Sequence, residues 1–104
     1  MSERRPTIPA ERTLLIVEDD KPFLQRLARA MESRGFAVST AESVADGLMA
    51  LETASPAFAV VDMRLADGNG LDVISALKSR RPEARAIVRV AWRRDDFEHR
   101  APAG

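Results

Sequence analysis

The segment LLIVEDD at residues 14–20 consists of four apolar residues followed directly by three acids, and it is the clearest indication of the fold. A short apolar run without polar alternation is typical of a strand that is buried on both faces of a parallel sheet. A second segment, AVVDMRLADGNGLD at residues 59–72, repeats this pattern and ends its apolar run at Asp62. We therefore expect two inner strands whose carboxyl ends carry acidic side chains.

Strand and helix patterns alternate on either side of these segments. The apolar patterns predict four strands, at residues 13–17, 36–40, 57–61 and 86–90. Helical spacing and capping residues predict three helices, from Asp20 to Gly35, from Ser43 to the Ser55-Pro56 stop, and, after a turn at 67–70, from Leu71 to about Ser79. Short connections between alternating elements imply parallel strands joined by right-handed crossovers. The predicted fold class is therefore α/β, an open parallel sheet with helices on both faces.

The composition fits one small domain without disulfides. The chain has 104 residues, of which 45% are hydrophobic and 31% are charged, and it contains no cysteine. A zinc–thiolate site is thus excluded, and every apolar run is far shorter than the roughly 20 residues of a membrane helix. We expect a cytoplasmic protein that does not enter a membrane, with a flexible leader at 1–12, an ordered domain at 13–90 and a tail at 91–104.

The net charge of zero hides an uneven distribution of charges. Residues 1–77 carry eight Lys or Arg and twelve Asp or Glu, which gives −4, whereas residues 78–94 carry seven basic residues and one acid, which gives +6. A basic strip of this size is compatible with a patch that binds phosphate or nucleic acid. No aromatic or glycine pattern accompanies the strip, so we favour a solvated helix end and loop.

Three acids, Glu18, Asp19 and Asp62, follow the two inner strands. If these strands are neighbours, as in the strand order 2-1-3-4, the three carboxylates meet at one edge of the sheet, where they repel each other unless a cation lies between them. All-oxygen ligands with few carboxylates suit Mg²⁺, and an aspartate beside such an ion can act as a nucleophile toward phosphorus. Asp20 and Asp67 we interpret instead as helix caps or solvated loop acids.

The two acidic segments resemble the receiver (CheY-like) domain of bacterial two-component response regulators. The closer resemblance, in residues 62–71 and in the helix at 23–35, is to redox-responsive global regulators of the RegA/PrrA type, and it covers about residues 13–88. The resemblance implies a flavodoxin-like fold, a Mg²⁺ cofactor, and a phosphoryl group that is accepted from a sensor histidine kinase in a system that regulates transcription.

The resemblance also implies a role for each acid of the site. Asp62 matches the phosphoacceptor, Asp19 the direct Mg²⁺ ligand, and Glu18 the second acidic residue, which often acts through a water molecule. Arg64 is expected to lend its backbone carbonyl to the ion. Beyond Asp62 no catalytic residue is implied, and we expect a signalling module rather than an enzyme.

The sequence departs from the family pattern after Val88. Val90 stands where receivers usually have a small or hydroxyl residue, and no lysine follows Lys78. The fourth helix, the fifth strand, the fifth helix and a DNA-binding output domain are not recognisable. We therefore expect an incomplete receiver that ends with its fourth strand, is altered by truncation or frameshift, transfers phosphoryl groups poorly and does not bind DNA itself.

The missing elements have a consequence for packing, and two other functions are compatible with the sequence. A sheet face that lacks its fifth helix is expected to expose apolar surface and to promote a homodimer or another association. A non-catalytic docking protein, which titrates a kinase or a full-length regulator through the first helix, remains the alternative function. A Mg²⁺-dependent phosphohydrolase is disfavoured, because no Asp-x-Asp pair or general acid follows the presumed nucleophile.

Overall fold

The structure, a computed structural model, describes residues 12–90. Within this range four strands form one parallel sheet in the order β2-β1-β3-β6. The strands are β1 (Thr13–Val17), β2 (Ala37–Ala41), β3 (Phe58–Asp62) and β6 (Arg85–Arg89). Because β6 is the fourth strand of this sheet in chain order, the predicted strand order 2-1-3-4 and the open α/β fold are confirmed.

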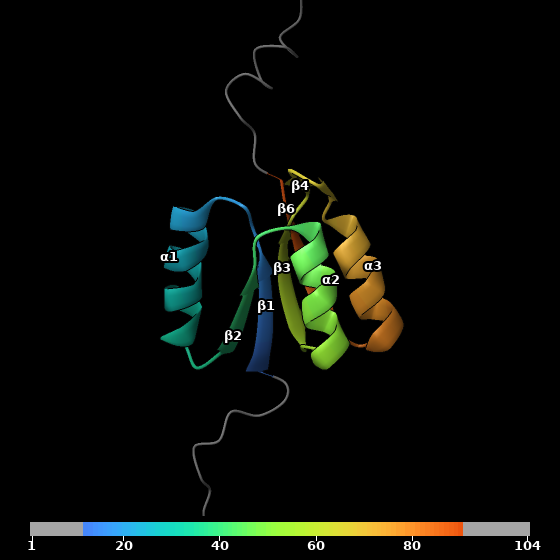
Figure 1. Ribbon diagram of the computed structural model, residues 1–104. Coiled ribbons are helices and arrows are strands. Elements are labelled where there is room, and N and C mark those ends of the chain that lie inside the picture. The colour runs from blue at the N-terminus through green and yellow to red at the C-terminus, as the bar shows by residue number, and fades with distance from the viewer. Residues whose placement is uncertain (1–11, 91–104) are drawn as a thin grey trace, which may run out of the picture.

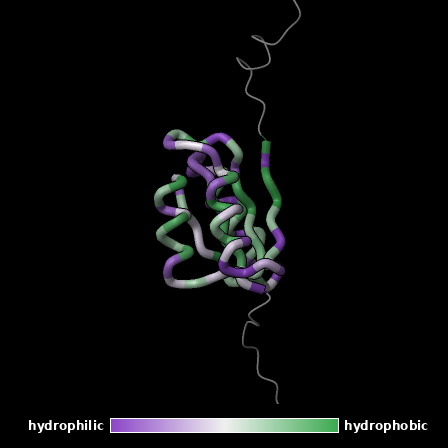
Figure 2. The backbone as a smooth tube through the Cα atoms, turned by 90° about the vertical axis from the view of Figure 1, so that its right-hand side faces the viewer, coloured by the Kyte–Doolittle hydropathy of each residue, from purple (hydrophilic) through white to green (hydrophobic). Residues whose placement is uncertain are grey.

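Three helices cover the two faces of the sheet. Figure 1 shows α1 (Lys21–Glu32) on one face and both α2 (Val44–Thr53) and α3 (Leu71–Arg80) on the other. The core is accordingly split into two clusters of buried side chains. The cluster under α1 contains Leu14, Ile16 and Leu24, and the larger cluster under α2 and α3 contains Leu15, Val17, Leu51, Val61, Val73 and Leu77. Figure 2 shows the backbone from the side, with hydrophobic and hydrophilic stretches alternating along the chain.

Local signals in the sequence explain where the first two helices begin. The Asp20 side chain accepts a hydrogen bond from the backbone N–H of Phe23 at 3.2 Å and caps α1. The Ser43 hydroxyl accepts one from the N–H of Asp46 at 3.0 Å and caps α2. After α1 the chain turns at Gly35, whose φ of 94° favours glycine. The predicted caps and the predicted stop of the first helix are confirmed.

The turn predicted at 67–70 overlaps a small hairpin, at residues 64–69, that the pattern did not predict. The two-residue strands β4 (Arg64–Leu65) and β5 (Gly68–Asn69) pair in an antiparallel arrangement. Strands this short have no periodicity that a sequence pattern can show. The bounds of β2, β3 and β6 also differ by one residue from the predicted ranges, which is the usual uncertainty at element ends.

Candidate metal centre

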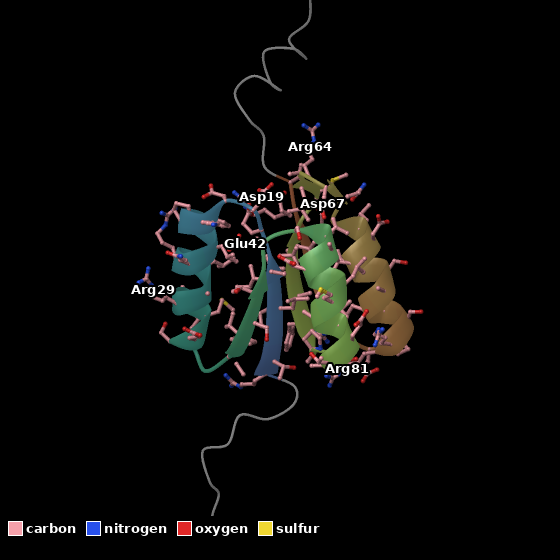
Figure 3. The ribbon with its side chains drawn as sticks, viewed as in Figure 1. Asp19, Arg29, Glu42, Arg64, Asp67 and Arg81 are labelled. Atoms are coloured by element: carbon pink, nitrogen blue, oxygen red, sulfur yellow. The ribbon has the colours of Figure 1, made fainter. Side chains whose placement is uncertain are left out.

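The three predicted acids meet at the carboxyl edge of the sheet. Glu18 and Asp19 directly follow β1, and Asp62 is the last residue of the neighbouring strand β3. One carboxylate oxygen from each residue lies within 4.8 Å of the other two. Glu18 and Asp62 are only 3% and 5% exposed, and Asp19 is half-buried. Figure 3 shows Asp19 at the same end of the sheet as Asp67, with Arg81 at the opposite end. The predicted convergence of the acids is confirmed.

Strand register explains why the two buried acids lie side by side. Val17 of β1 pairs with Val61 of β3, so the next residues along each strand, Glu18 and Asp62, are also neighbours. Side chains alternate between the two faces of a strand, which directs both carboxylates to the face that α1 covers. Ile16 and Val60, each two residues before one of these acids, lie on the same face.

A fourth residue, Arg89, extends this row onto β6. Arg89 pairs with Asp62 in the parallel register between β3 and β6. Its Nη1 donates a hydrogen bond to Oε1 of Glu18 at 2.7 Å and lies 4.0 Å from Oδ2 of Asp62. Its guanidinium carbon lies 4.1 Å from the centre of the Phe23 ring in the first turn of α1. The sequence pattern does not predict a role for Arg89, because this residue only interrupts the apolar character of its strand.

The carboxylate of Glu18 has an unusual environment. Its burial raises the pKa above the ordinary value, and the neighbouring charge of Asp62 acts in the same direction. The backbone N–H of Asp20, which donates to Oε2 of Glu18 at 3.1 Å, and the guanidinium of Arg89 oppose this rise in pKa. Removing one of these partners is therefore expected to destabilise the ionised form of Glu18.

Asp62 is held in place by the backbone that follows it. The N–H of Arg64 donates a hydrogen bond to Oδ1 of Asp62 at 3.2 Å, so the start of the β4–β5 hairpin orients the carboxylate. In Figure 3 the Arg64 side chain extends away from the body of the protein at this end of the sheet. The proposed contribution of the Arg64 backbone carbonyl to an ion stays a prediction, as do the roles assigned to Glu18, Asp19 and Asp62.

The donor set fits a hard divalent cation. Three carboxylates lie close together, two of them are buried, and none of the donors is a nitrogen or sulfur atom. Such a set matches the oxygen preference of Mg²⁺, which keeps several waters when it binds to a few carboxylates. Glu18, Asp19 and Asp62 are therefore the side chains that can hold the ion at this edge.

Asp20 and Asp67, which also lie near this edge, cap helices as predicted. Asp20 caps α1, and Asp67 caps α2 from 23 residues away, since its Oδ1 and Oδ2 accept hydrogen bonds from the N–H groups of Val44 and Ala45 at 2.8 and 3.0 Å. These bonds hold the pKa of Asp67 below its ordinary value of 3.8. The sequence predicts the capping chemistry but not which helix Asp67 reaches.

Replacement of Asp67 is expected to give a pH-dependent loss of stability. Because the pKa of Asp67 is lowered in the folded state, its stabilising contribution is present above the unfolded pKa and disappears as the pH falls through the folded pKa. Asp67→Asn is therefore expected to melt below the wild type at pH 7, with a gap that narrows in acid. Asp46→Asn, which removes a charge in the first turn of α2, is the control. Melting curves with a gap that is constant from pH 7 to acid contradict this account.

Several members of the basic strip have partners within the protein. Among the described residues, Nη1 of Arg81 donates to the backbone carbonyl of Ser55 at 2.8 Å, and its Nε pairs with Glu83 at 3.2 Å. Lys78 donates to the carbonyl of Ala84, and Arg89 contacts the acidic site. These contacts favour a structural role over a nucleic-acid-binding patch for this part of the strip.

Comparison with known proteins identifies the family. A family model described as "Response regulator receiver domain" matches residues 14–102. The chain belongs to the response regulator receiver family. The docking alternative is not favoured by this match. Within residues 12–90, none of the helices has the length and apolar composition of a membrane span.

Curated relatives of the receiver are bacterial regulators. It is 58% identical over 79 residues to the photosynthetic apparatus regulatory protein RegA of Cereibacter sphaeroides. The aligned residues cover 76% of this chain and 43% of that protein. It is also 58% identical over 81 residues to the acid tolerance regulatory protein ActR of Rhizobium meliloti, with 78% and 42% of the two chains covered. The predicted resemblance to RegA-type regulators is confirmed, and the chain spans less than half the length of these relatives.

Solved structures agree with the fold. A response regulator from Burkholderia pseudomallei, determined with a phosphorylated aspartic acid, a calcium ion and citrate, superposes with a TM-score of 0.73 at 30% identity. The match covers 79% of this receiver and 48% of that chain. The response regulator MaeR bound to beryllium trifluoride superposes with a TM-score of 0.66 at 28% identity, with 86% and 75% of the two chains covered.

The predicted division of the chain stays a prediction. The leader, except for Arg12, and the tail at 91–104 lie outside the described residues. The family match extends to residue 102 and so includes most of the segment that was assigned to a tail.

Proposed function

We propose that this receiver accepts a phosphoryl group on Asp62 from the phosphohistidine of a sensor histidine kinase. The observation that carries the proposal is the meeting of Glu18, Asp19 and Asp62 within 4.8 Å at the carboxyl edge of the sheet. Open α/β sheets bind their ligands at this edge. In the transfer, the bond between phosphorus and the histidine nitrogen breaks, and a bond forms between phosphorus and a carboxylate oxygen of Asp62.

The residues of the site have separate tasks in this proposal. Asp62 provides the nucleophile, which the N–H of Arg64 holds in place. Asp19, Asp62 and the backbone carbonyl of Arg64 would hold Mg²⁺ directly, and Glu18 would act through water. When bound, Mg²⁺ neutralises negative charge on the incoming phosphoryl group. Asp62 is only 5% exposed, so little water reaches its unmodified carboxylate.

Phosphotransfer in this chain is expected to be weak. Val90 follows β6, where the family pattern has a residue that can donate a hydrogen bond to a phosphoryl oxygen, and a valine side chain cannot donate. This departure removes stabilisation of the transferred charge rather than the nucleophile itself.

Acetyl phosphate with Mg²⁺ tests the proposal. We expect intact-protein mass spectrometry to detect a minor, short-lived species that carries one phosphoryl group, and peptide mapping to locate the group on Asp62. Asp62→Asn should not be modified, whereas Asp72→Asn, an exposed acid in the first turn of α3, should behave like the wild type. Modification that survives in Asp62→Asn refutes the acceptor assignment, and a stable, complete modification refutes the impairment.

The wider role of the receiver follows from the same proposal. We assign it to cytoplasmic phosphorelay signalling rather than to catalysis, as part of the control of transcription by a regulator related to RegA and ActR. The DNA contacts belong to an output domain that the described residues do not include. The receiver itself then contacts the kinase.

The apolar surface beside β6 supports association of the receiver. Within residues 12–90, β6 pairs only with β3, and Ile87 is 65% exposed. A groove of about 320 Å³ on the α1 face is lined by apolar side chains, among them Phe58, Val60 and Ile87. We expect sedimentation to show self-association that Ile87→Lys weakens. A strictly monomeric wild type at high concentration contradicts this expectation.

A further inference from the structure

The acidic site already contains a positive charge from the protein itself. The guanidinium of Arg89 lies 2.7 Å from Glu18 and 4.0 Å from Asp62, two of the three carboxylates that are suited to a metal ion. The Arg89 side chain is 34% exposed, whereas that of Glu18 is 3% exposed. The ion pair therefore joins a buried carboxylate to a partly exposed guanidinium. An ion pair with one fully buried partner is screened less than a surface pair.

Arg89 is held in this position by its neighbours. The register of β6 places it beside Asp62, and the Phe23 ring lies 4.1 Å from its guanidinium carbon, within the range of a cation–π contact. Strand pairing fixes the backbone of Arg89, because its carbonyl accepts a hydrogen bond from the N–H of Met63 at 2.9 Å. The position of the guanidinium is therefore fixed by strand pairing and by its contact with Phe23.

The same position conflicts with a metal ion. Both oxygens of Glu18 already accept hydrogen bonds, Oε1 from Arg89 and Oε2 from the backbone N–H of Asp20. A divalent ion that uses Glu18, directly or through a water molecule, has to share one of these oxygens with its present donor. It also lies near a second positive charge, which lowers its affinity. A guanidinium and a hydrated Mg²⁺ thus compete for the same acid.

We propose that Arg89 is a built-in counter-ion of the acidic site, which a divalent metal ion must displace from Glu18 before the receiver can bind a phosphoryl group. The inference rests on the proposed function and deepens it, because it names the residue that limits metal binding. Arg89 stabilises the metal-free site by neutralising buried acids. It therefore biases the receiver toward the unmodified state.

Replacement of Arg89 tests the inference through Mg²⁺ affinity rather than through phosphotransfer. In calorimetric titrations of the full chain with MgCl₂, Arg89→Leu should bind Mg²⁺ roughly tenfold more tightly than the wild type, the effect expected when one charge-assisted hydrogen bond no longer competes. Arg85→Leu is the matched control, because Arg85 lies on the same strand and face but pairs with Phe58, about 13 Å from the acids. Its affinity should not change.

Melting temperatures supply a second readout. Without metal, Arg89→Leu should melt lower than Arg85→Leu, because it leaves Glu18 buried without its partner. Saturating Mg²⁺ should close this gap, since the ion then replaces the lost charge. A gap that persists unchanged in Mg²⁺ overturns the inference, because it indicates a purely structural contact.

Two further measurements keep the test valid if Arg89→Leu does not fold. Arg89→Lys keeps the charge but loses the planar contact with Phe23, and it should bind Mg²⁺ with an affinity between those of the wild type and Arg89→Leu. In the wild type, the guanidinium NMR signal of Arg89 should shift as Mg²⁺ is added.

The outcomes separate this inference from the proposed function. Equal Mg²⁺ affinity in the wild type and both Arg89 variants overturns the counter-ion role but leaves the metal site and the phosphoacceptor intact. Absence of Mg²⁺ binding in every variant overturns the inference together with the proposed metal site. Modification of Asp62 by acetyl phosphate tests the acceptor independently of either result.

Discussion

Asp19→Asn is expected to lower the Mg²⁺ affinity of the receiver by roughly 10- to 100-fold. Replacing a residue that only orients a metal ligand already causes a loss of this size, so replacing a ligand should cost at least as much. The amide keeps the shape of the side chain but removes its negative charge and one of its two oxygens. A hard divalent ion needs both the charge and the oxygen ligands. Asp19 is half-buried, whereas Glu18 and Asp62 are buried, so its replacement perturbs the fold least of the three. Calorimetric titration with MgCl₂ measures the loss.

Asp20→Asn provides the control for this experiment. It removes the same charge one residue further along the chain, and asparagine caps helices as well as aspartate does, so α1 should keep its start. We expect its Mg²⁺ affinity to change by less than about threefold, because only screened charge at the mouth of the site is lost. Equal losses in the two variants contradict a specific ligand role for Asp19 and indicate a general effect of acidic charge.

Gly70→Ala is expected to destabilise the receiver by about 3 kcal/mol, the upper part of the usual range for overpacking in a core. A Cβ atom on Gly70 would lie 2.1 Å from the backbone oxygen of Asp62 and 2.5 Å from Cγ1 of Val61. The backbone oxygen cannot rotate away as a side chain can, so the start of α3 has to move from the end of β3. Because a small domain has only about 5–15 kcal/mol of total stability, this loss is large.

Gly47→Ala is the matched comparison for Gly70→Ala. Its Cβ would meet methyl groups of Val73 and Val17 at 3.1 and 3.3 Å, which are side-chain atoms that can shift slightly. Alanine also gains about 1 kcal/mol of helix propensity over glycine inside α2, which offsets the crowding. Urea unfolding should place Gly47→Ala near the wild type. If Gly70→Ala is equally stable, the close contact between α3 and the acidic strand is not a constraint.

The strands and the acidic site could be predicted from short-range patterns in the sequence. Apolar runs that end in acids mark β1 and β3, and neighbouring parallel strands bring their carboxyl ends to one edge. The meeting of Glu18 and Asp62 therefore follows once β1 and β3 are neighbours in register. The helix caps at Asp20 and Ser43 are also local, because each bonds to a residue three positions further along. Such features need no knowledge of the tertiary structure.

The role of Arg89 could not be predicted in this way. Within its own strand it only interrupts an apolar run, and 71 residues separate it from Glu18. The useful signal is the register of β3 and β6, in which residues two apart share a face and Arg89 falls beside Asp62. Asp67 is similar, because its cap on α2 spans 23 residues and depends on where the β4–β5 hairpin turns.

The most direct test of the account is a crystal structure of the receiver with Mn²⁺, an ion of similar preference whose anomalous scattering identifies it. We predict one strong peak bound by carboxylate oxygens of Asp19 and Asp62, next to Glu18, and no peak at this site in Asp19→Asn. Manganese that binds only to exposed acids elsewhere, with the edge formed by β1 and β3 left without the ion, contradicts the assignment of this edge as the metal and phosphoacceptor site.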